Sequence, residues 1–309
     1  MKIKYLLVLV LLLVGGLFIV KYTKPKSVIN TKPKEQKLYP VTSISHAHGL
    51  AIDLKDPNKL YIATHHGLYV LVNEKDIFQV GKSNDDYMGF SSDPKNANSF
   101  FSSGHPESGG NIGFQMSEDG GFNWKQLSDG IDGPVDFHAM TVSPVNPYLI
   151  FGWYRGAIQR STDGGKNWVA LGNTKFVVVS LNADSQNENV VYAASPMGGF
   201  VSRNKGLSWE ELSKELSKTF VSTIVPNPND SKQLLSFSEK LGLAKSEDSG
   251  TSWKKIEADF EGGTVLYIAF NMKNPTVVYA LTEKNSLFKS TDEGVSWKRV
   301  NINSKLEQE

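Results

Sequence analysis

From residue 41 onward the chain alternates short apolar runs with turn residues. The stretch from His48 to Val72, HGLAIDLKDPNKLYIATHHGLYVLV, holds three such runs separated by Asp, Pro, Asn and Gly. Short runs rich in β-branched and aromatic residues, bounded by turn residues, are typical of strands. Later segments align on this one and give six copies, in which Tyr61 corresponds to Phe101, Leu149, Tyr192, Leu235 and Tyr279. The pattern predicts an all-β domain of six repeats over residues 41–303.

A shorter motif, Ser-x-Asp-x-Gly-x-x-Trp, recurs in the last five of these copies. Its first residues are at positions 117, 161, 202, 246 and 290, so the steps are 44, 41, 44 and 44. A fixed period in this range signals one supersecondary unit copied around a ring or along a solenoid. The motif positions are Ser117, Asp119, Gly121 and Trp124; Ser161, Asp163, Gly165 and Trp168; Ser202, Asn204, Gly206 and Trp209; Ser246, Asp248, Gly250 and Trp253; and Ser290, Asp292, Gly294 and Trp297.

Each residue type in the motif has a structural role in a hairpin turn. Ser and Asp oxygens accept hydrogen bonds from backbone N–H groups of the turn. Gly adopts a positive φ without steric cost, and Trp packs a large apolar surface onto the sheet. The third copy carries Asn204 in place of Asp, and the first repeat lacks the motif, since Asn73–Asp76 closes its turn. The motif therefore indicates architecture and requires no substrate.

These motifs resemble Asp-box repeats, also called BNR repeats, which occur in bacterial sialidases, sortilin-type receptors and photosystem-assembly propellers. The resemblance implies a β-propeller with the boxes on its outer rim, between the third and fourth strands of each blade and away from an active site. Six repeats of four strands then make a six-bladed β-propeller with Asp-box hairpins. We expect the segment Tyr39–Ile44 to complete the last blade and close the ring.

The N-terminal region differs from the repeats. Lys2 and Lys4 precede an apolar run from Leu6 to Val20, and no convincing small-residue cleavage site follows. We expect residues 1–21 to form a hydrophobic transmembrane helix, an uncleaved signal anchor that holds the propeller on the extracytoplasmic side of the cell membrane. The alternative is a cleaved signal peptide and a secreted product. Residues 22–40, rich in Lys and Pro, predict a solvated linker, and residues 304–309 form a polar tail.

Charge and cysteine content exclude two classes of function. Residues 1–40 contain eight lysines and one glutamate, which leaves a net charge of −6 for the remainder of a chain whose total is +1. A mildly acidic propeller argues against nucleic acid as a partner. The chain has no cysteine, which excludes a disulfide framework and a cysteine-ligated metal.

The histidines are distributed unevenly among the repeats. All six fall in the first three repeats, mostly at the start of the first strand or the end of the second: His46, His48, His65, His66, His105 and His138. In a propeller these two positions face one mouth of the central channel. Imidazoles with Met88 nearby suit copper or zinc, and Asp86, Glu107 and Asp136 can supply carboxylates or partners that orient the ligands. The competing interpretation is a wet channel mouth in which the histidines bind water and backbone.

A second resemblance concerns the strings that carry these histidines. HAHGLA (His46–Ala51), ATHHGL (Ala63–Leu68), SGHPE (Ser103–Glu107) and DFHAM (Asp136–Met140) are similar to those of a bacterial Asp-box propeller group labelled glycosylhydrolase-like. That name derives from the boxes, so the resemblance implies the fold and transfers no activity.

The residues disfavour one glycosidase class and leave another open. Sialidases hold a carboxylate with three arginines, whereas this chain has only Arg155, Arg160, Arg203 and Arg299, and three of these are expected on the rim. Another glycosidase needs two carboxyl groups flanking the glycosidic bond. Glu239 and Glu283 occupy equivalent positions in adjacent blades, and Trp153 with Tyr154 can form a sugar platform. Each glutamate precedes a lysine, which equally suits ordinary loop ion pairs.

Three functions from different classes remain. The first is a binding or assembly module whose protein or glycan ligand meets the histidine-lined mouth, with copper or zinc as a candidate cofactor. The second is a hydrolase acting on glycans. The third is a propeller that binds proteins through its rim and has no small-molecule site.

Overall fold

The computed structural model describes residues 36–302 except 42 and 43. Within these ranges all regular secondary structure is β-strand, arranged in six antiparallel sheets. The predicted anchor (residues 1–21), most of the predicted linker and the polar tail lie outside the described residues. In the described ranges there is no helix long and apolar enough to cross a membrane.

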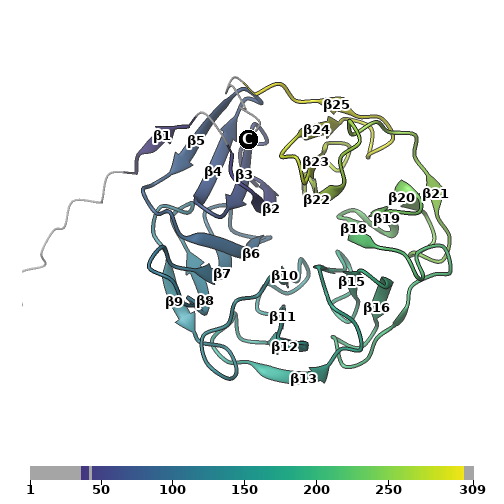
Figure 1. Ribbon diagram of the computed structural model, residues 1–309, viewed down its shortest axis with the longest axis horizontal. Helices are drawn as coiled ribbons and strands as arrows, with labels where there is room; N and C mark the ends of the chain where they lie inside the picture. The colour runs from purple at the N-terminus through teal and green to yellow at the C-terminus, as the bar shows by residue number, and fades with distance from the viewer. Residues whose placement is uncertain (1–35, 42–43, 303–309) are drawn as a thin grey trace, which may run out of the picture. The chain divides into compact units, whose positions relative to one another are not determined.

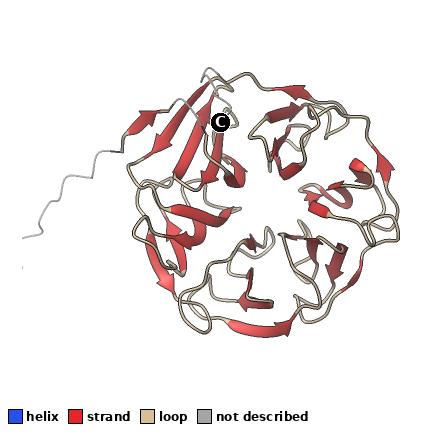
Figure 2. Cartoon of the chain, viewed as in Figure 1, coloured by secondary structure: helices blue, strands red, loops and turns tan. Residues whose placement is uncertain are grey.

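The six sheets are the blades of a propeller, and in five of them the strands are paired in chain order, whereas in blade 1 strand β1 lies outside β5 (Figures 1 and 2). Blade 1 contains β1 (Leu38–Pro40), β2 (Ala47–Ile52), β3 (Lys59–Thr64), β4 (Gly67–Val72) and β5 (Asp76–Val80). Blade 2 contains β6 (Asp86–Ser92), β7 (Phe100–His105), β8 (Phe114–Ser117) and β9 (Lys125–Ser128). Blade 3 contains β10 (Ala139–Val142), β11 (Ile150–Tyr154), β12 (Ala157–Ser161) and β13 (Val169–Asn173).

The last three blades have short outer strands. Blade 4 contains β14 (Ser180–Ala183), β15 (Val191–Ser195), β16 (Gly198–Ser202) and β17 (Glu210–Glu211). Blade 5 contains β18 (Val221–Asn227), β19 (Asp230–Ser238), β20 (Gly242–Ser246) and β21 (Lys254–Lys255). Blade 6 contains β22 (Val265–Phe270), β23 (Val278–Thr282), β24 (Leu287–Ser290) and β25 (Lys298–Arg299). The predicted six-bladed propeller is confirmed, and the strands nearest the centre are β2, β6, β10, β14, β18 and β22.

The hydrophobic core consists of six clusters, and each lies between two neighbouring blades. Phe114 of blade 2, for example, packs with Phe137 and Ile150 of blade 3. Apolar residues from both sheets fill each of these layers because a sheet with two apolar faces must bury both. The six clusters together make the core a ring that follows the ring of blades.

The segment Tyr39–Ile44 does not complete the last blade, so this prediction about ring closure was wrong. Strand β1 pairs with β5, the outer strand of blade 1, through Leu38↔Val80 and Pro40↔Phe78. Blade 6 already has its own fourth strand, β25, so the N-terminal strand extends the free edge of blade 1 instead and gives it five strands.

Blades 1 and 6 are joined by side-chain packing rather than by a shared sheet. Ile44 and Ile62 lie in one cluster with Tyr279 and Leu281 of blade 6. Glu74, in the turn between β4 and β5, accepts a hydrogen bond from the Tyr279 hydroxyl at 2.9 Å and pairs with Lys289. The ring is therefore closed by apolar packing together with a hydrogen bond and an ion pair at the rim.

The Asp boxes lie in the hairpins between the third and fourth strands of blades 2 to 6, as the resemblance implied. In the box of blade 3, Ser161 Oγ accepts from the Gly165 N–H at 2.8 Å and donates to Asp163 Oδ1 at 2.8 Å. Asp163 Oδ1 in turn accepts from the Asn167 N–H at 2.9 Å, and Trp168 Nε1 donates to the Gly165 carbonyl at 3.1 Å. The box thus satisfies the polar backbone groups of its own turn.

The box glycine also fits the box against the preceding blade. Gly165 has a φ of 85°, a conformation that side chains with a Cβ rarely adopt. A Cβ added there would lie 1.9 Å from Cε1 of Phe114 in blade 2. The glycines of the other four boxes have the same positive φ, with the preceding blade's side chains 2.3–3.1 Å from the added atom: Gly121, Gly206, Gly250 and Gly294. Each box therefore requires glycine for both turn geometry and blade contact.

The box of blade 4 keeps this geometry without a carboxylate. Asn204 Oδ1 accepts from the Ser208 N–H at 2.9 Å, and its amide donates to Ser208 Oγ at 2.8 Å. Trp209 Nε1, in contrast to the indoles of the other boxes, is buried without a hydrogen-bond partner among the described residues. Asparagine can replace aspartate here because the serine hydroxyl accepts as well as donates.

Replacing the box glycine separates the cost of the turn from the cost of the blade contact. We expect Gly165→Ala to lower the free energy of unfolding by about 3 kcal/mol, because it adds overpacking to a strained φ. Gly172→Ala is the matched control: Gly172 has a φ of 96°, and nothing lies within 4 Å of an added Cβ. We expect Gly172→Ala to lower the free energy of unfolding by only about 1 kcal/mol. Urea unfolding followed by tryptophan fluorescence measures both, and equal losses would contradict the role of the contact.

The box carboxylates predict acid sensitivity. Hydrogen bonds from Ser252 and Ser296 hold the pKa of Asp248 and Asp292 at about 2, and bonds from the Asn167 backbone and side chain do the same for Asp163, against an ordinary 3.8. A lowered folded-state pKa contributes stability that is present above pH about 4 and is lost as the pH falls toward 2. The variant Asp248→Asn copies the arrangement at Asn204. We expect it to reduce the slope of the free energy of unfolding against pH between pH 4 and 2 and to leave that slope unchanged above pH 5. An unaltered slope between pH 4 and 2 would rule out this contribution.

Candidate functional site

The register of the blades brings the starts of the inner strands beside the ends of the second strands. Asp86 pairs with His105 across β6 and β7, and the His65 N–H donates to the His46 carbonyl at 3.2 Å. The equivalent bonds in blades 5 and 6 run from Glu239 to Phe220 and from Glu283 to Thr264. These positions therefore surround one mouth of the propeller.

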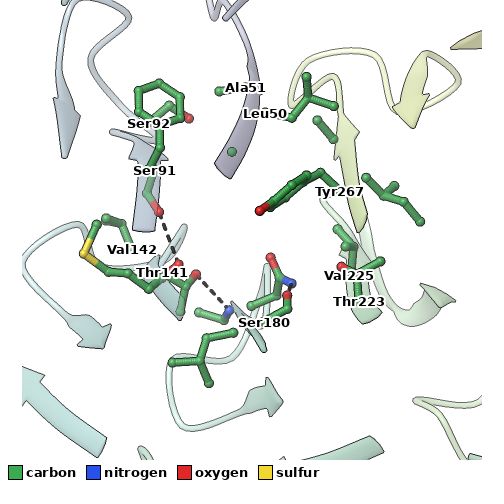
Figure 3. Close-up of a pocket in the computed structure, with 18 of the residues that line it drawn as sticks. Leu50, Ala51, Ser91, Ser92, Thr141, Val142, Ser180, Thr223, Val225 and Tyr267 are labelled. Atoms are coloured by element: carbon green, nitrogen blue, oxygen red, sulfur yellow. Dashed lines mark hydrogen bonds between the residues drawn. The ribbon is translucent and has the colours of Figure 1, made fainter. Parts of the chain in front are cut away.

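A channel runs inward from this mouth and is lined by residues of all six blades, with a cavity volume of about 210 Å³. Ser91, Thr141 and Ser180 face it with small polar side chains, and Tyr267 extends its hydroxyl toward the centre (Figure 3). Burial raises the pKa of Tyr267, and the negative charge of Asp86 raises it further. His48 and His138 also line the channel. Tyr267 was missed by sequence reasoning because the inner strand of blade 6 reads as an ordinary apolar run.

Two histidines and one aspartate meet at the mouth between blades 1 and 2. His48 is the second residue of β2, the inner strand of blade 1, His65 follows β3, and Asp86 begins β6. His65 Nδ1 lies 2.8 Å from Asp86 Oδ2, and His48 Nε2 lies 3.5 Å from Asp86 Oδ1. One donor atom from each residue falls within 4.8 Å of the others. We refer to His48, His65 and Asp86 as the first ligand group.

The first ligand group contains two buried polar atoms without partners. His48 Nε2 and Asp86 Oδ1 face each other, and neither makes a hydrogen bond within the described part of the chain. His48 is 9% exposed. Burial lowers its pKa to about 3, and the neighbouring His65, His46 and His138 add to the effect. A buried, neutral imidazole next to a carboxylate is an arrangement that can coordinate a cation.

A second group of the same composition lies between blades 2 and 3. His105 ends β7, and Asp136 and His138 precede β10. Asp136 Oδ2 lies 2.7 Å from His138 Nε2 and 3.1 Å from His105 Nε2, and the three donors lie within 4.8 Å of one another. The hydrogen bond to Asp136 raises the pKa of His138 and outweighs the opposing effect of burial. We refer to His105, Asp136 and His138 as the second ligand group.

The other residues predicted for this site lie around the two groups. The ring of His46 is exposed and stacks on His65 with centroids 5.6 Å apart. His66 and Glu107 line an open cavity of about 440 Å³ together with His65, Asp86 and His105. Met88 is buried in β6. The histidine and aspartate donors brought together are nitrogen and oxygen atoms.

Sequence reasoning named Asp86 and Asp136, with Glu107, as carboxylates that either bind the metal or orient its ligands, and the structure places each of the two aspartates between two histidines. A signal was present in the repeats. His46, Asp86 and Asp136 occupy one repeat position, two residues before the aligned inner-strand residue, and blades 4 to 6 have Val177, Phe220 and Thr264 there. Titratable residues at one repeat position in three consecutive blades indicate a one-sided site.

The residues proposed for glycan binding are engaged elsewhere. Trp153 packs in the cluster of blades 3 and 4, and its indole donates to Thr174 Oγ1 at 3.0 Å. Tyr154 packs in the cluster of blades 2 and 3, and its hydroxyl accepts from Asn111 at 3.0 Å. Glu239 is exposed, and Glu283 is half-buried with Oε2 unpartnered among the described residues. Both rings are half-buried, and the buried part of each packs between blades, Trp153 in one interblade cluster and Tyr154 in another.

Three of the four arginines also have partners away from the mouth. Arg203 pairs with Glu210, and Arg299 pairs with Glu261. Arg160 donates to the Lys205 carbonyl of the neighbouring blade at 3.1 Å. Only Arg155 is without such a bond to another blade or loop among the described residues; it lies over the Tyr154 ring at 5.0 Å.

Comparison with known proteins supports the architecture. Residues 241–309 match the model of the Sortilin-Vps10 family, described as "Sortilin, neurotensin receptor 3". This segment contains the last two Asp boxes. A search of curated proteins gave no match. The resemblance to Asp-box and sortilin-like propellers is therefore confirmed.

Solved structures share the fold at low sequence identity. The GH74 enzyme of Niastella koreensis is 16% identical with a TM-score of 0.56, over 82% of this chain and 46% of that one. The GH74 xyloglucanase of Xanthomonas campestris is 15% identical with a TM-score of 0.57, over 86% of this chain and 47% of that one. YCF48 of Cyanidioschyzon merolae is 18% identical with a TM-score of 0.53, over 87% of this chain and 89% of that one. The chain thus spans less than half the length of the two GH74 enzymes, and these likenesses show the fold alone.

Proposed function

We propose that this protein is an extracytoplasmic, membrane-tethered binding module whose propeller mouth holds a divalent transition-metal ion at the first ligand group. The observation that carries the proposal is a pair of buried atoms 3.5 Å apart, His48 Nε2 and Asp86 Oδ1, that make no hydrogen bond among the described residues and have His65 beside them. A buried polar atom without a partner costs free energy, and a cation between these atoms would satisfy both.

The donor set favours particular ions. Imidazole nitrogen suits zinc and copper, and aspartate oxygen also binds zinc. Three protein ligands leave a coordination position for water or for a ligand. We therefore expect Zn²⁺ or Cu²⁺, bound so that a partner arriving at the mouth can contact it.

The fold is compatible with a binding role. A solved YCF48 structure that is 17% identical to this chain, with a TM-score of 0.53, contains a bound D1 peptide, so a propeller of this fold can bind a peptide. The glycan-hydrolase alternative has less support, because part of the Trp153 ring and part of the Tyr154 ring are buried between blades. Binding at the mouth is the function that the described side chains favour.

Metal content tests the proposal directly. The full-length chain, purified without a histidine tag and stripped with chelator, is dialysed against Zn²⁺ or Cu²⁺, and bound metal is measured by elemental analysis. We expect His65→Gln and Asp86→Asn each to bind one ion fewer per chain than the wild type, because each removes one of three ligands. The side chain of His65 is 46% exposed, so its replacement should leave folding intact.

Asp132→Asn is the matched control, since Asp132 is an exposed acid in the loop that follows β9. It should bind as much metal as the wild type. A wild-type chain that binds no ion, or ligand variants that retain full metal content, would refute the site.

The tether has a separate test. If residues 1–21 are an uncleaved anchor, the intact N-terminus should be recovered by mass spectrometry from the membrane fraction of expressing cells. Recovery of a shortened chain in the medium alone would establish the secreted alternative instead.

A further inference from the structure

The second ligand group carries an observation independent of the first. Its acid, Asp136, has a side chain only 7% exposed, and its Oδ1 has no hydrogen-bond partner in the described ranges. The other oxygen, Oδ2, faces the Nε2 atoms of both His105 and His138. A buried carboxylate oxygen that lacks a partner is the kind of atom a bound cation satisfies.

The hydrogen bonds of His105 specify which of its nitrogens is free. His105 Nδ1 lies 2.7 Å from the Gly110 carbonyl oxygen. A carbonyl oxygen only accepts, so Nδ1 must carry the hydrogen, and the neutral ring then has its lone pair on Nε2. That lone pair faces Asp136 Oδ2 at 3.1 Å. When the ring is neutral, a cation bound between these two atoms would be coordinated by both of them.

This arrangement matches the way metal-binding histidines are oriented. A ligating imidazole commonly donates its other N–H to a backbone carbonyl, which holds the ring and its tautomer. In His105 the acceptor of this bond is the Gly110 carbonyl, in the loop that follows β7. His138, with a side chain 59% exposed, supplies the second nitrogen from the solvent side.

We propose that His105, Asp136 and His138 form a second site for a divalent transition-metal ion, so that the mouth carries two ions. The inference extends the proposed function and shares its premise that the mouth binds metal, but it rests on different atoms. Each site has two imidazole nitrogens and one carboxylate oxygen, so each can hold the same ion.

The two sites are neighbours within the mouth. Asp86 of the first group and His105 of the second stand directly opposite each other in the register of β6 and β7. The cavity of about 440 Å³ is lined by residues of both groups, together with His66 and Glu107. A ligand that enters this cavity therefore meets His65 and Asp86 of the first group and His105 of the second.

Metal stoichiometry in the full-length, untagged chain tests the inference. We expect the wild type to bind two Zn²⁺ ions per chain, and His105→Gln and His65→Gln to bind one each. The double variant should bind none, and Asp132→Asn should bind two. His105 has a side chain 41% exposed, which makes its replacement safer for folding than that of the buried Asp136. Thermal unfolding of each variant checks that the fold is retained.

The outcomes separate this inference from the proposed function. One ion in the wild type that is lost in His65→Gln but kept in His105→Gln leaves the proposed function standing and overturns the second site. One ion that is lost in either variant means a single shared site, which also overturns it. No ion in the wild type refutes both proposals.

Loading with Cu²⁺ tests the proximity of the two ions. The wild type should give an electron paramagnetic resonance spectrum broadened by dipolar coupling, and each single variant should give a sharp, isolated Cu²⁺ signal. Two bound ions without coupling would contradict neighbouring sites.

Discussion

Packing between neighbouring blades is the interaction on which the rest of the structure depends. Each blade has two apolar faces, and each face is buried only by the next sheet, so no blade is stable without its neighbours. The six interblade clusters supply this burial, and the Asp boxes adjust its geometry at the rim. Gly165 against Phe114 illustrates the adjustment, since the turn of one blade fits against the core side chain of the preceding one. Serine and aspartate maintain the turn so that glycine can make this approach.

The junction of blades 1 and 6 shows how the ring closes without an Asp box in blade 1. The turn after β4 has positive φ at both of its central residues, Asn73 and Glu74, and the Lys75 N–H donates to the Val72 carbonyl at 3.1 Å. Positive φ at both central residues is typical of the turn type that suits twisted strands. This geometry directs Glu74 toward Tyr279 and Lys289 of blade 6. An ion pair and a hydrogen bond therefore stand where the other blades use a box, above the same kind of apolar cluster.

The same architecture explains why the mouth is one-sided. A ring of equivalent repeats brings six equivalent positions to the mouth, and the residues at these positions decide what the mouth can bind. Blades 1 to 3 carry histidine and aspartate there, whereas blade 4 carries Val177 and Val179. A site therefore forms without any change of fold, from side chains that are far apart in the sequence but held by rigid sheets.

The repeats by themselves determined the strand order, the blade number and the location of the boxes, because period and turn chemistry are local properties of the chain. They also placed the histidines at one mouth. The partner of β1 depended on which sheet edge was free, and a three-residue strand contains too little pattern to choose between β5 and β25. The roles of Asp86 and Asp136 likewise depended on tertiary structure, because burial and the lack of a hydrogen-bond partner are properties of surroundings contributed by other blades. Trp153 and Tyr154 illustrate the same limit of the sequence. Residue type shows what an aromatic ring can bind, but only the neighbours packed against the ring decide how much of it is free.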